Sequence, residues 1–249
     1  MTVSSAVTAR DSYQEKRLAS LASHVMIKAS IGLEIGACNK PTVPANAGVC
    51  RFADFRSAKD MVDLWGLDPE TVCNVDYILA RSACISEQIP DKFDYIIACH
   101  VIEHVPDPIG YLHGLAKLLN PGGIIMLAVP DKRVTFDLHR PLTTIDHLLM
   151  DFYDECRYPS IEHIVEFHRY AVAFETGADV PVAESFAFAK SNFESGMADS
   201  HCHVWDDATF HTQFAYLSDA GLLGGLALEG FEPTPKGFNE CTAVFKRQA

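Results

Sequence analysis

Short apolar runs that end in small or polar residues recur through the first half of the chain. They predict five strands, over residues 31–36, 49–52, 75–79, 93–99 and 124–129. Aromatic and β-branched residues dominate the fourth run and favour an extended backbone there. Every residue of the fifth run is apolar, which is typical of a central strand that is buried on both faces of its sheet.

Helical spacing of apolar residues appears before and between these runs. Residues 11–29, 57–65 and 108–119 predict helices, and Asn-Pro-Gly-Gly follows the last of them. Strands and helices that alternate at this spacing predict a parallel sheet with right-handed crossovers, which is the α/β fold class. The stripe in residues 11–29 consists of Leu18, Leu21, Val25 and Met26.

The C-terminal part of the chain departs from this alternation. Residues 207–220 predict a helix, with Asp206 or Asp207 as its cap. Residues 226–231 and 240–246 then predict two strands with no helix between them. That connection favours an antiparallel pair at one edge of the sheet.

The rhythm of strands and helices stops between residues 131 and 200. Residues 144–153 predict one helix, and the remainder of this stretch is expected to be irregular and acidic. An ordinary connection is much shorter, and doubly wound sheets bind ligands beyond the carboxyl ends of their strands. We therefore expect a single domain over 1–249, with an N-terminal helical segment (1–29) and an insertion (131–200) that caps the substrate pocket.

The charge of the chain excludes two classes of partner. Lys and Arg number 20 and Asp and Glu number 33, which gives a net charge of −13. Residues 141–200 hold eleven of the acidic residues against three basic ones, and so carry −8 of that total. Nucleic acids and anionic membrane surfaces attract basic proteins, so neither is expected as a partner.

The same sequence predicts a cytoplasmic location. No run of about 18 apolar residues is present, as a membrane span would need. The first residues lack the apolar core of a secretory signal. The eight cysteines include no C-x-x-C pair, which favours reduced thiols over disulfides or a zinc ribbon.

Two features point to a nucleotide-like ligand. The sequence Gly-Leu-Glu-Ile-Gly at 32–36 ends the first strand with a glycine, which allows a ligand to approach the backbone. It does not match G-x-G-x-x-G, so it is a weak dinucleotide fingerprint. Asp54 ends the second strand, where a carboxylate can accept two hydrogen bonds from a ribose diol; the alternative is a solvated turn residue.

The order of these motifs resembles that of the class I S-adenosylmethionine-dependent methyltransferases. The resemblance rests on LEIG at 33–36, Asp54, FDYIIACHVIEHV at 93–105 and LLNPGG at 118–123. It implies a Rossmann-like sheet of seven strands, mostly parallel with an antiparallel last strand, and helices on both faces. It also implies S-adenosylmethionine as the cofactor.

The chain is more closely similar to methyltransferase domains found with bacterial polysaccharide and glycosyltransferase systems. Pro41, HVIEHVPD at 100–107, VPDKR at 129–133, HRP at 139–141 and HCHVW at 201–205 carry this second resemblance.

The family resemblance assigns cofactor contacts position by position. The loop after the first strand would contact the methionine part of the cofactor, and Asp54 would contact the ribose. The loop after the third strand would contact the adenine, and the end of the fourth strand would lie beside the sulfonium. Because Arg81 or Ser82 stands where the family often has an acidic residue, we expect backbone contacts to adenine. The expected contacts are Glu34, Gly36, Ala37, Asp54, Ser82, Ala83, Cys99 and His100.

Methyl transfer to a hydroxyl needs an aligned nucleophile and a group that removes its proton. Candidate bases follow the fourth and fifth strands, and we select His100, Asp131 and His139 as catalytic. A histidine can take such a proton near neutral pH. His100 could instead contact only the cofactor, and Asp131 could instead form a turn after Pro130.

Residues near the expected pocket are candidates for acceptor binding: His104, Lys132, Arg133, Arg140, His201, His203 and Trp205. The basic residues could hold a phosphate or carboxylate, or form a solvated loop. The histidines at 201 and 203 would point the same way on a strand. They could contact substrate, serve only structure, or bind a divalent metal with Asp131; no metal is expected. Trp205 could stack on a sugar ring.

The sequence therefore predicts a cytoplasmic methyltransferase that acts on a hydroxyl of a sugar, nucleotide-linked sugar or other small metabolite. Two alternatives remain open: an N-methyltransferase that acts on an amine, and a non-catalytic module that binds S-adenosylmethionine. The expected partner is a small-molecule acceptor, and a homodimer is compatible with the sequence.

Overall fold

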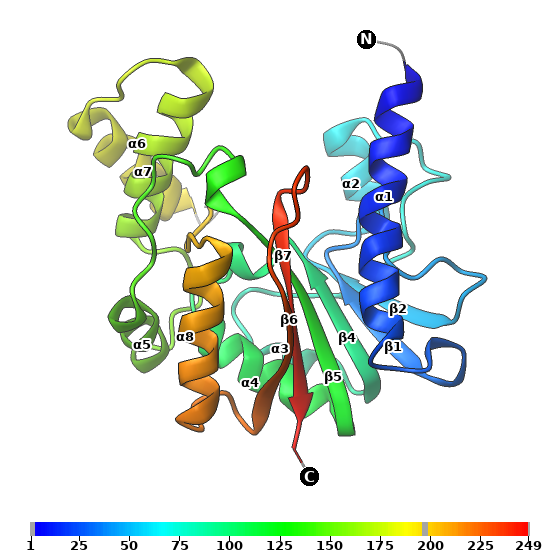
Figure 1. The fold of residues 1–249 in the computed structure, drawn as a ribbon. Helices are drawn as coiled ribbons and strands as arrows, with labels where there is room; N and C mark the ends of the chain where they lie inside the picture. Colours follow the sequence, from blue (N-terminus) through cyan, green and yellow to red (C-terminus); the bar gives the residue numbers. More distant parts are fainter. Residues whose placement is uncertain (1–2, 196–198, 249) are drawn as a thin grey trace.

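A seven-stranded sheet in the order β3-β2-β1-β4-β5-β7-β6 forms the centre of the computed structural model, which describes residues 3–195 and 199–248 (Figure 1). β7 runs antiparallel to both of its neighbours, and the pairs among β1 to β5 are parallel. The predicted Rossmann-like fold with an antiparallel last strand is confirmed. The strands are β1 (Ile31–Ile35), β2 (Val49–Asp54), β3 (Tyr77–Ile78), β4 (Phe93–Cys99), β5 (Leu119–Pro130), β6 (Leu226–Glu232) and β7 (Glu240–Arg247).

Helices cover both faces of the sheet, as predicted. Alternate residues of β4 separate two apolar clusters: Ile96 joins the cluster beneath α4 and α8, and Ile97 joins the cluster beneath α1. Figure 1 shows α4 and α8 on one side of the sheet and α1 on the other. The helices are α1 (Val3–Ala22), α2 (Ala58–Trp65), α3 (Ile85–Gln88), α4 (Pro108–Leu118), α5 (Ile145–Tyr153), α6 (Ile161–Thr176), α7 (Val182–Ser195) and α8 (Asp207–Asp219), with 3-10 turns η1 (Ile27–Ala29), η2 (Ile102–His104) and η3 (Lys132–Val134).

The N-terminal helix ends earlier than its apolar stripe predicted. The stripe extends to Met26, but α1 stops at Ala22 and Met26 is 78% exposed. The hydroxyl of Ser23 donates to the carbonyl of Ser20 at 2.7 Å, which competes with continuation of the helix. Residues 1–2 of the predicted 1–29 segment lie outside the described residues.

The 131–200 segment contains more regular structure than predicted. Its first helix, α5, forms as expected, with the Thr144 hydroxyl accepting from the backbone of His147 at 3.2 Å. The expectation of an irregular remainder was wrong, because α6 and α7 follow and pack against each other. They stand together at the upper left of Figure 1, away from the sheet. Residues 196–198 of this segment lie outside the described residues.

No helix in the described ranges is both long and apolar enough to span a membrane.

Candidate active site

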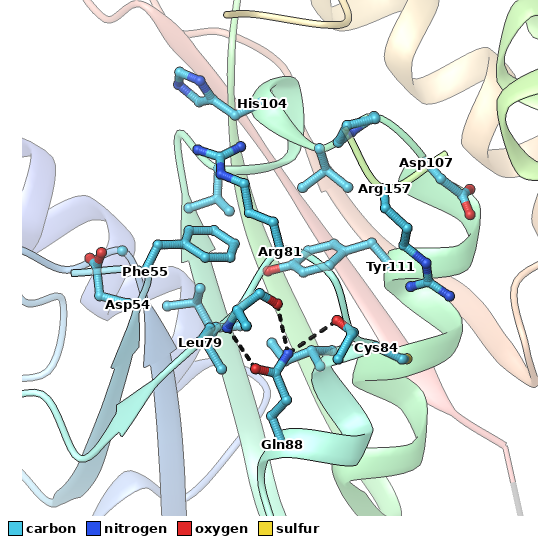
Figure 2. Close-up of a pocket in the computed structure, with 18 of the residues that line it drawn as sticks. Asp54, Phe55, Leu79, Arg81, Cys84, Gln88, His104, Asp107, Tyr111 and Arg157 are labelled. Carbon is cyan, nitrogen blue, oxygen red and sulfur yellow. Dashed lines mark hydrogen bonds between the residues drawn. The ribbon is translucent and has the colours of Figure 1, made fainter. Parts of the chain in front are cut away.

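A cavity of about 530 Å³ opens where the carboxyl ends of β1, β2 and β4 meet. Gly36 follows β1, Asp54 ends β2 and His100 follows β4, and all three line the cavity. Parallel strands present their carboxyl ends at one edge of the sheet, which is where this fold class binds ligands. Figure 2 shows the cavity, with Asp54, Arg81 and Tyr111 among the side chains that line it.

Gly36 allows the backbone to form part of the cavity wall. Its φ is +72°, a left-handed conformation that disfavours residues with a side chain. A Cβ at this position would lie 3.0 Å from Cγ2 of Val101. The absence of a side chain therefore leaves room at the end of β1 for a close ligand.

Asp54 places a carboxylate in the cavity wall. One oxygen accepts a hydrogen bond from the backbone of Arg56 at 3.1 Å, which orients the side chain at the end of β2. Partial burial raises the pKa of Asp54, although backbone hydrogen bonds oppose that shift. A ligand that donates hydrogen bonds, such as a ribose diol, would stabilise the charged form.

Gln88 holds the loop that follows β3. Its amide oxygen accepts from the backbone of Ala80 at 2.6 Å, and its amide nitrogen donates to the carbonyls of Ala80 and Ala83 (Figure 2). Ala83 lines the cavity, but Ser82 does not. Gln88 was not predictable from the sequence, since no local pattern distinguishes an amide that binds backbone from one that faces water.

Aromatic and cationic side chains complete this side of the cavity. The guanidinium of Arg81 lies 4.9 Å from the ring centre of Phe55. Tyr111 extends from α4 with its hydroxyl toward the cavity interior (Figure 2). That hydroxyl is buried and has no hydrogen-bond partner among the described residues. Buried polar atoms are normally paired, so a bound ligand would satisfy it.

His100 is held at the cavity by an unusual backbone and a buried carboxylate. Its φ is +53°, which is uncommon outside glycine and tends to occur at functional sites. Its Nε2 lies 2.9 Å from Oε2 of Glu240 on β7. Arg17 of α1 donates to the same carboxylate from Nε at 2.9 Å. Burial opposes the charge, but these two partners lower the pKa of Glu240 to about 2.

Comparison with known proteins identifies the family. A model described as methyltransferase domain matches residues 51–215, which is more than half of the chain. The chain belongs to the methyltransferase domain family. S-adenosylmethionine is the cofactor that this membership implies, and the glycine turn, Asp54 and the unpaired Tyr111 hydroxyl fit such a ligand.

Curated relatives cover only part of this methyltransferase. A ubiquinone biosynthesis O-methyltransferase from Burkholderia vietnamiensis is 28% identical over 122 residues, which is 47% of this chain and 52% of the relative. One from Pseudoalteromonas translucida is 33% identical over 63 residues, 25% of this chain and 27% of the relative. The chain thus spans between about a quarter and a half of the length of these relatives.

A solved structure supports the fold of the methyltransferase. A provisionally named zinc-dependent alcohol dehydrogenase from Rhodobacter sphaeroides has a TM-score of 0.52 and 15% identity, over 90% of this chain and 86% of its own. At this identity the likeness concerns the fold alone.

Four residues predicted to contact the cofactor do not line the cavity of the methyltransferase: Glu34, Ala37, Ser82 and Cys99. Glu34 is buried in β1 and accepts hydrogen bonds from the backbone and hydroxyl of Thr42 at 2.8–3.0 Å. Burial raises its pKa to about 7, against the effect of these bonds. Glu34 therefore holds the 36–42 loop in place through its hydrogen bonds to Thr42.

Two of the three predicted catalytic residues also lie elsewhere. Asp131 is buried after β5, and Arg133 donates to both of its oxygens from Nε at 2.9 and 3.1 Å. His139 is exposed and neighbours Phe174, with their ring centres 6.0 Å apart. Neither lines the cavity, so the structure brings only His100 of the three to it.

The predicted basic residues bind their own neighbours in the protein: both arginines form ion pairs, and the lysine donates to a backbone carbonyl. Arg140 is fully buried, and its guanidinium donates to Asp137, Glu166 and the carbonyl of His201, each at 2.9 Å. Arg133 pairs with Asp131 and Asp207. Lys132 donates to the carbonyl of Arg140. None of the three lines the cavity, so no cationic patch faces it at this point.

Trp205 belongs to the apolar core. It is 1% exposed, its ring packs against Phe210 and Phe214, and its nitrogen donates to Gln213 at 2.9 Å. A sugar ring cannot reach it in this position. The backbone of Trp205 forms a parallel bridge with Asp131 after β5, and its side chain is buried against α8.

The histidines at 201 and 203 do not share a strand, and the structure separates them. Nδ1 of His201 lies 2.6 Å from Oδ2 of Asp137, whereas Nε2 of His203 lies 3.1 Å from the carbonyl of Pro106. Asp131 joins neither, so the metal site considered from His201, His203 and Asp131 does not form. Each histidine instead belongs to a different cluster of metal-ligating side chains.

The first cluster lies beside the cavity and contains Glu103, His104 and His201. Glu103 is 1% exposed, and neither of its carboxylate oxygens has a hydrogen-bond partner among the described residues. His104 lines the cavity, and its Nδ1 lies 3.2 Å from a carboxylate oxygen of Asp199. A carboxylate and two imidazoles form a donor set that suits a divalent cation.

Proposed function

We propose that this methyltransferase transfers the methyl group of S-adenosylmethionine to a hydroxyl of a sugar, a nucleotide-linked sugar or another small metabolite. The observation that carries the proposal is the pairing of His100 with the buried carboxylate of Glu240 at the cavity wall. The curated relatives are named O-methyltransferases, which supports the choice of oxygen.

The walls of the cavity offer a place for each part of the cofactor. Gly36 would lie against the methionine part, Asp54 would accept the ribose hydroxyls, and the loop held by Gln88 would border the adenine. The cofactor, when bound, supplies an activated methyl group on a sulfonium sulfur. A cavity of about 530 Å³ is within the usual range for small-molecule sites.

The His100–Glu240 pair supports removal of a proton from the acceptor. An ionised Glu240 accepts a hydrogen bond from Nε2–H of His100, which leaves the lone pair on Nδ1. His100 lines the cavity with a side chain that is 32% exposed, and Nδ1, which lies 3.8 Å from the buried carboxylate of Glu103, is the atom that would take the proton of a bound hydroxyl. Glu240 then stabilises the imidazolium, as a carboxylate does for a catalytic histidine in other enzymes.

The test is methyl transfer with a panel of acceptors, which includes methyl glycosides, nucleotide-linked sugars, catechols and primary amines. We expect S-adenosylhomocysteine to form with a hydroxyl acceptor. His100→Ala should lower turnover about 100-fold or more, the contribution typical of a general base. His139→Ala is the matched control, because His139 is exposed and lies off the cavity.

Two results would contradict the proposal. Transfer only to amines would favour the N-methyltransferase alternative. Full turnover by the His100→Ala variant with a hydroxyl acceptor would remove His100 as the base.

A further inference from the structure

Four side chains of metal-ligating types lie close together near the cavity, and none of the four lines it. They are His147, Asp151, His163 and His203, and one ligand atom of each lies within 4.8 Å of those of the others. The first two lie four residues apart on α5 and therefore share one face of that helix. His163 comes from the first turn of α6, and His203 from the segment before α8.

The distances in this cluster match those of a four-coordinate metal site. Oδ2 of Asp151 lies 3.0, 3.4 and 3.7 Å from Nε2 of His147, His163 and His203. Zinc binds histidine nitrogen and carboxylate oxygen at about 2.0–2.2 Å in a tetrahedron, which separates neighbouring ligand atoms by about 3.3 Å. The three observed distances bracket that value.

Burial leaves some of these polar atoms without partners. Oδ2 of Asp151 is buried, and no donor among the described residues meets it in hydrogen-bonding geometry. His203 is 1% exposed, and its Nδ1 also lacks a partner among them. Buried carboxylates and imidazoles are normally paired or bound to a metal.

Hydrogen bonds within the cluster account for only part of the arrangement. Nε2 of His147 and Nε2 of His163 lie 2.7 Å apart, so one can donate to the other. The backbone of Ser160 donates to Nδ1 of His163, which places the proton of that ring on Nε2. This explains the contact between the two rings but leaves Oδ2 of Asp151 without a donor. A metal ion would have to displace that proton, and also the proton that Nε2 of His203 donates to the carbonyl of Pro106.

We propose that His147, Asp151, His163 and His203 bind a zinc ion that fastens α5 and α6 to the wall of the cavity. Four protein ligands fill a tetrahedron, which is the pattern of a structural site. His147 is 29% exposed at its side chain and offers a path for the ion.

The position of the site explains what the ion would do. His203 contacts the carbonyl of Pro106, and Cys156 donates to Oδ1 of Asp151. Pro106 and Cys156 both line the cavity. The ion would therefore join three separate parts of the chain next to the part of the cavity wall that contains Pro106 and Cys156, and the inference stands whether or not the proposed reaction is correct.

The experiment uses the full chain, freed of metal by a chelator and titrated with Zn²⁺ alone and with Co²⁺ alone. We expect one Zn²⁺ per chain, a rise in the thermal midpoint on binding, and visible Co²⁺ absorption bands typical of tetrahedral coordination. Asp151→Asn and His147→Gln should each weaken Zn²⁺ binding at least 100-fold. Glu103→Gln is the matched control, since Glu103 belongs to the other cluster.

Several results would overturn the proposal. No uptake of Zn²⁺ by the wild-type chain, together with an unchanged thermal midpoint, would leave a metal-free hydrogen-bonded cluster. Equal affinity in Asp151→Asn and the wild type, or loss of binding in Glu103→Gln alone, would assign the metal to another site. Because the Co²⁺ spectrum is recorded on the wild-type chain, a variant that fails to fold does not decide the outcome.

Discussion

His100 illustrates what a linear sequence can and cannot predict about one residue. Its position after the fourth strand placed it at the cavity, because the end of a predicted strand locates the ligand edge of the sheet. Its partner Glu240 lies 140 residues away in sequence, on the strand inserted between β5 and β6. Arg17, which balances that carboxylate, comes from the N-terminal helix. No local motif connects these three residues.

Other residue predictions failed because motif residues serve the fold. Trp205, Arg140 and Glu34 are each at most 1% exposed, and each is satisfied by neighbours within the protein. A sequence motif shows that a side chain is placed near a site. It does not show whether that side chain points into the cavity or into the core behind it, since burial depends on packing between distant segments.

Glu34 gives a prediction about pH. Burial raises its pKa in the folded protein to about 7, above the ordinary value of 4.5. The folded state therefore holds this proton more tightly, and the free energy of unfolding should fall as pH rises from about 4.5 through 7. The shift in pKa corresponds to a decrease in the free energy of unfolding on the order of 3 kcal/mol. Urea unfolding at pH 5 and pH 8 measures it, with Glu34→Gln as the variant that lacks this titration. An identical pH dependence in both proteins would contradict the assignment.

At the scale of elements, the sheet was predictable and three helices, the short α3 and the pair α6 and α7, were not. The strands of the sheet follow apolar runs, and α5 has both an apolar face and a Thr144 cap. In contrast, α6 buries only His163, Ile164 and Ala171. It packs with α7 through contacts such as the stacked rings of His168 and Phe188, whose centres are 4.0 Å apart. Helices that pack mainly on each other leave a weak apolar stripe in the sequence.

The short helix α3 gives a testable prediction about the cofactor site. Gln88 makes three hydrogen bonds to the backbone of the loop after β3, and Gln88→Ala removes them all. We expect the loop to loosen and the affinity for S-adenosylmethionine to fall about tenfold, which is the loss of one or two net hydrogen bonds. Calorimetric titration measures the change. Gln248→Ala, at an exposed position, is the control, and equal affinities for all three proteins would show that Gln88 does not shape the cofactor site.

For the whole molecule, the structure changes the meaning of the acidic charge. The sequence places −8 of the net −13 within residues 141–200, which suggested an acidic cover over the pocket. The cavity itself is balanced. Its charged lining consists of Asp54, Asp107, Asp199, Arg56, Arg81 and Arg157. The acidic surplus of residues 141–200 therefore gives no reason to prefer a cationic amine as the acceptor.

The most direct test of the account is binding of S-adenosylmethionine, measured by calorimetry on the wild-type chain and on Asp54→Ala. The account predicts binding in the micromolar to millimolar range that is usual for enzyme substrates. It also predicts a loss of about 10- to 100-fold in the variant, because a charged hydrogen-bond acceptor for the ribose is removed. The thermal midpoint of the free variant checks that it folds. No binding to the wild type at millimolar cofactor, or equal affinity in both proteins, would contradict the account.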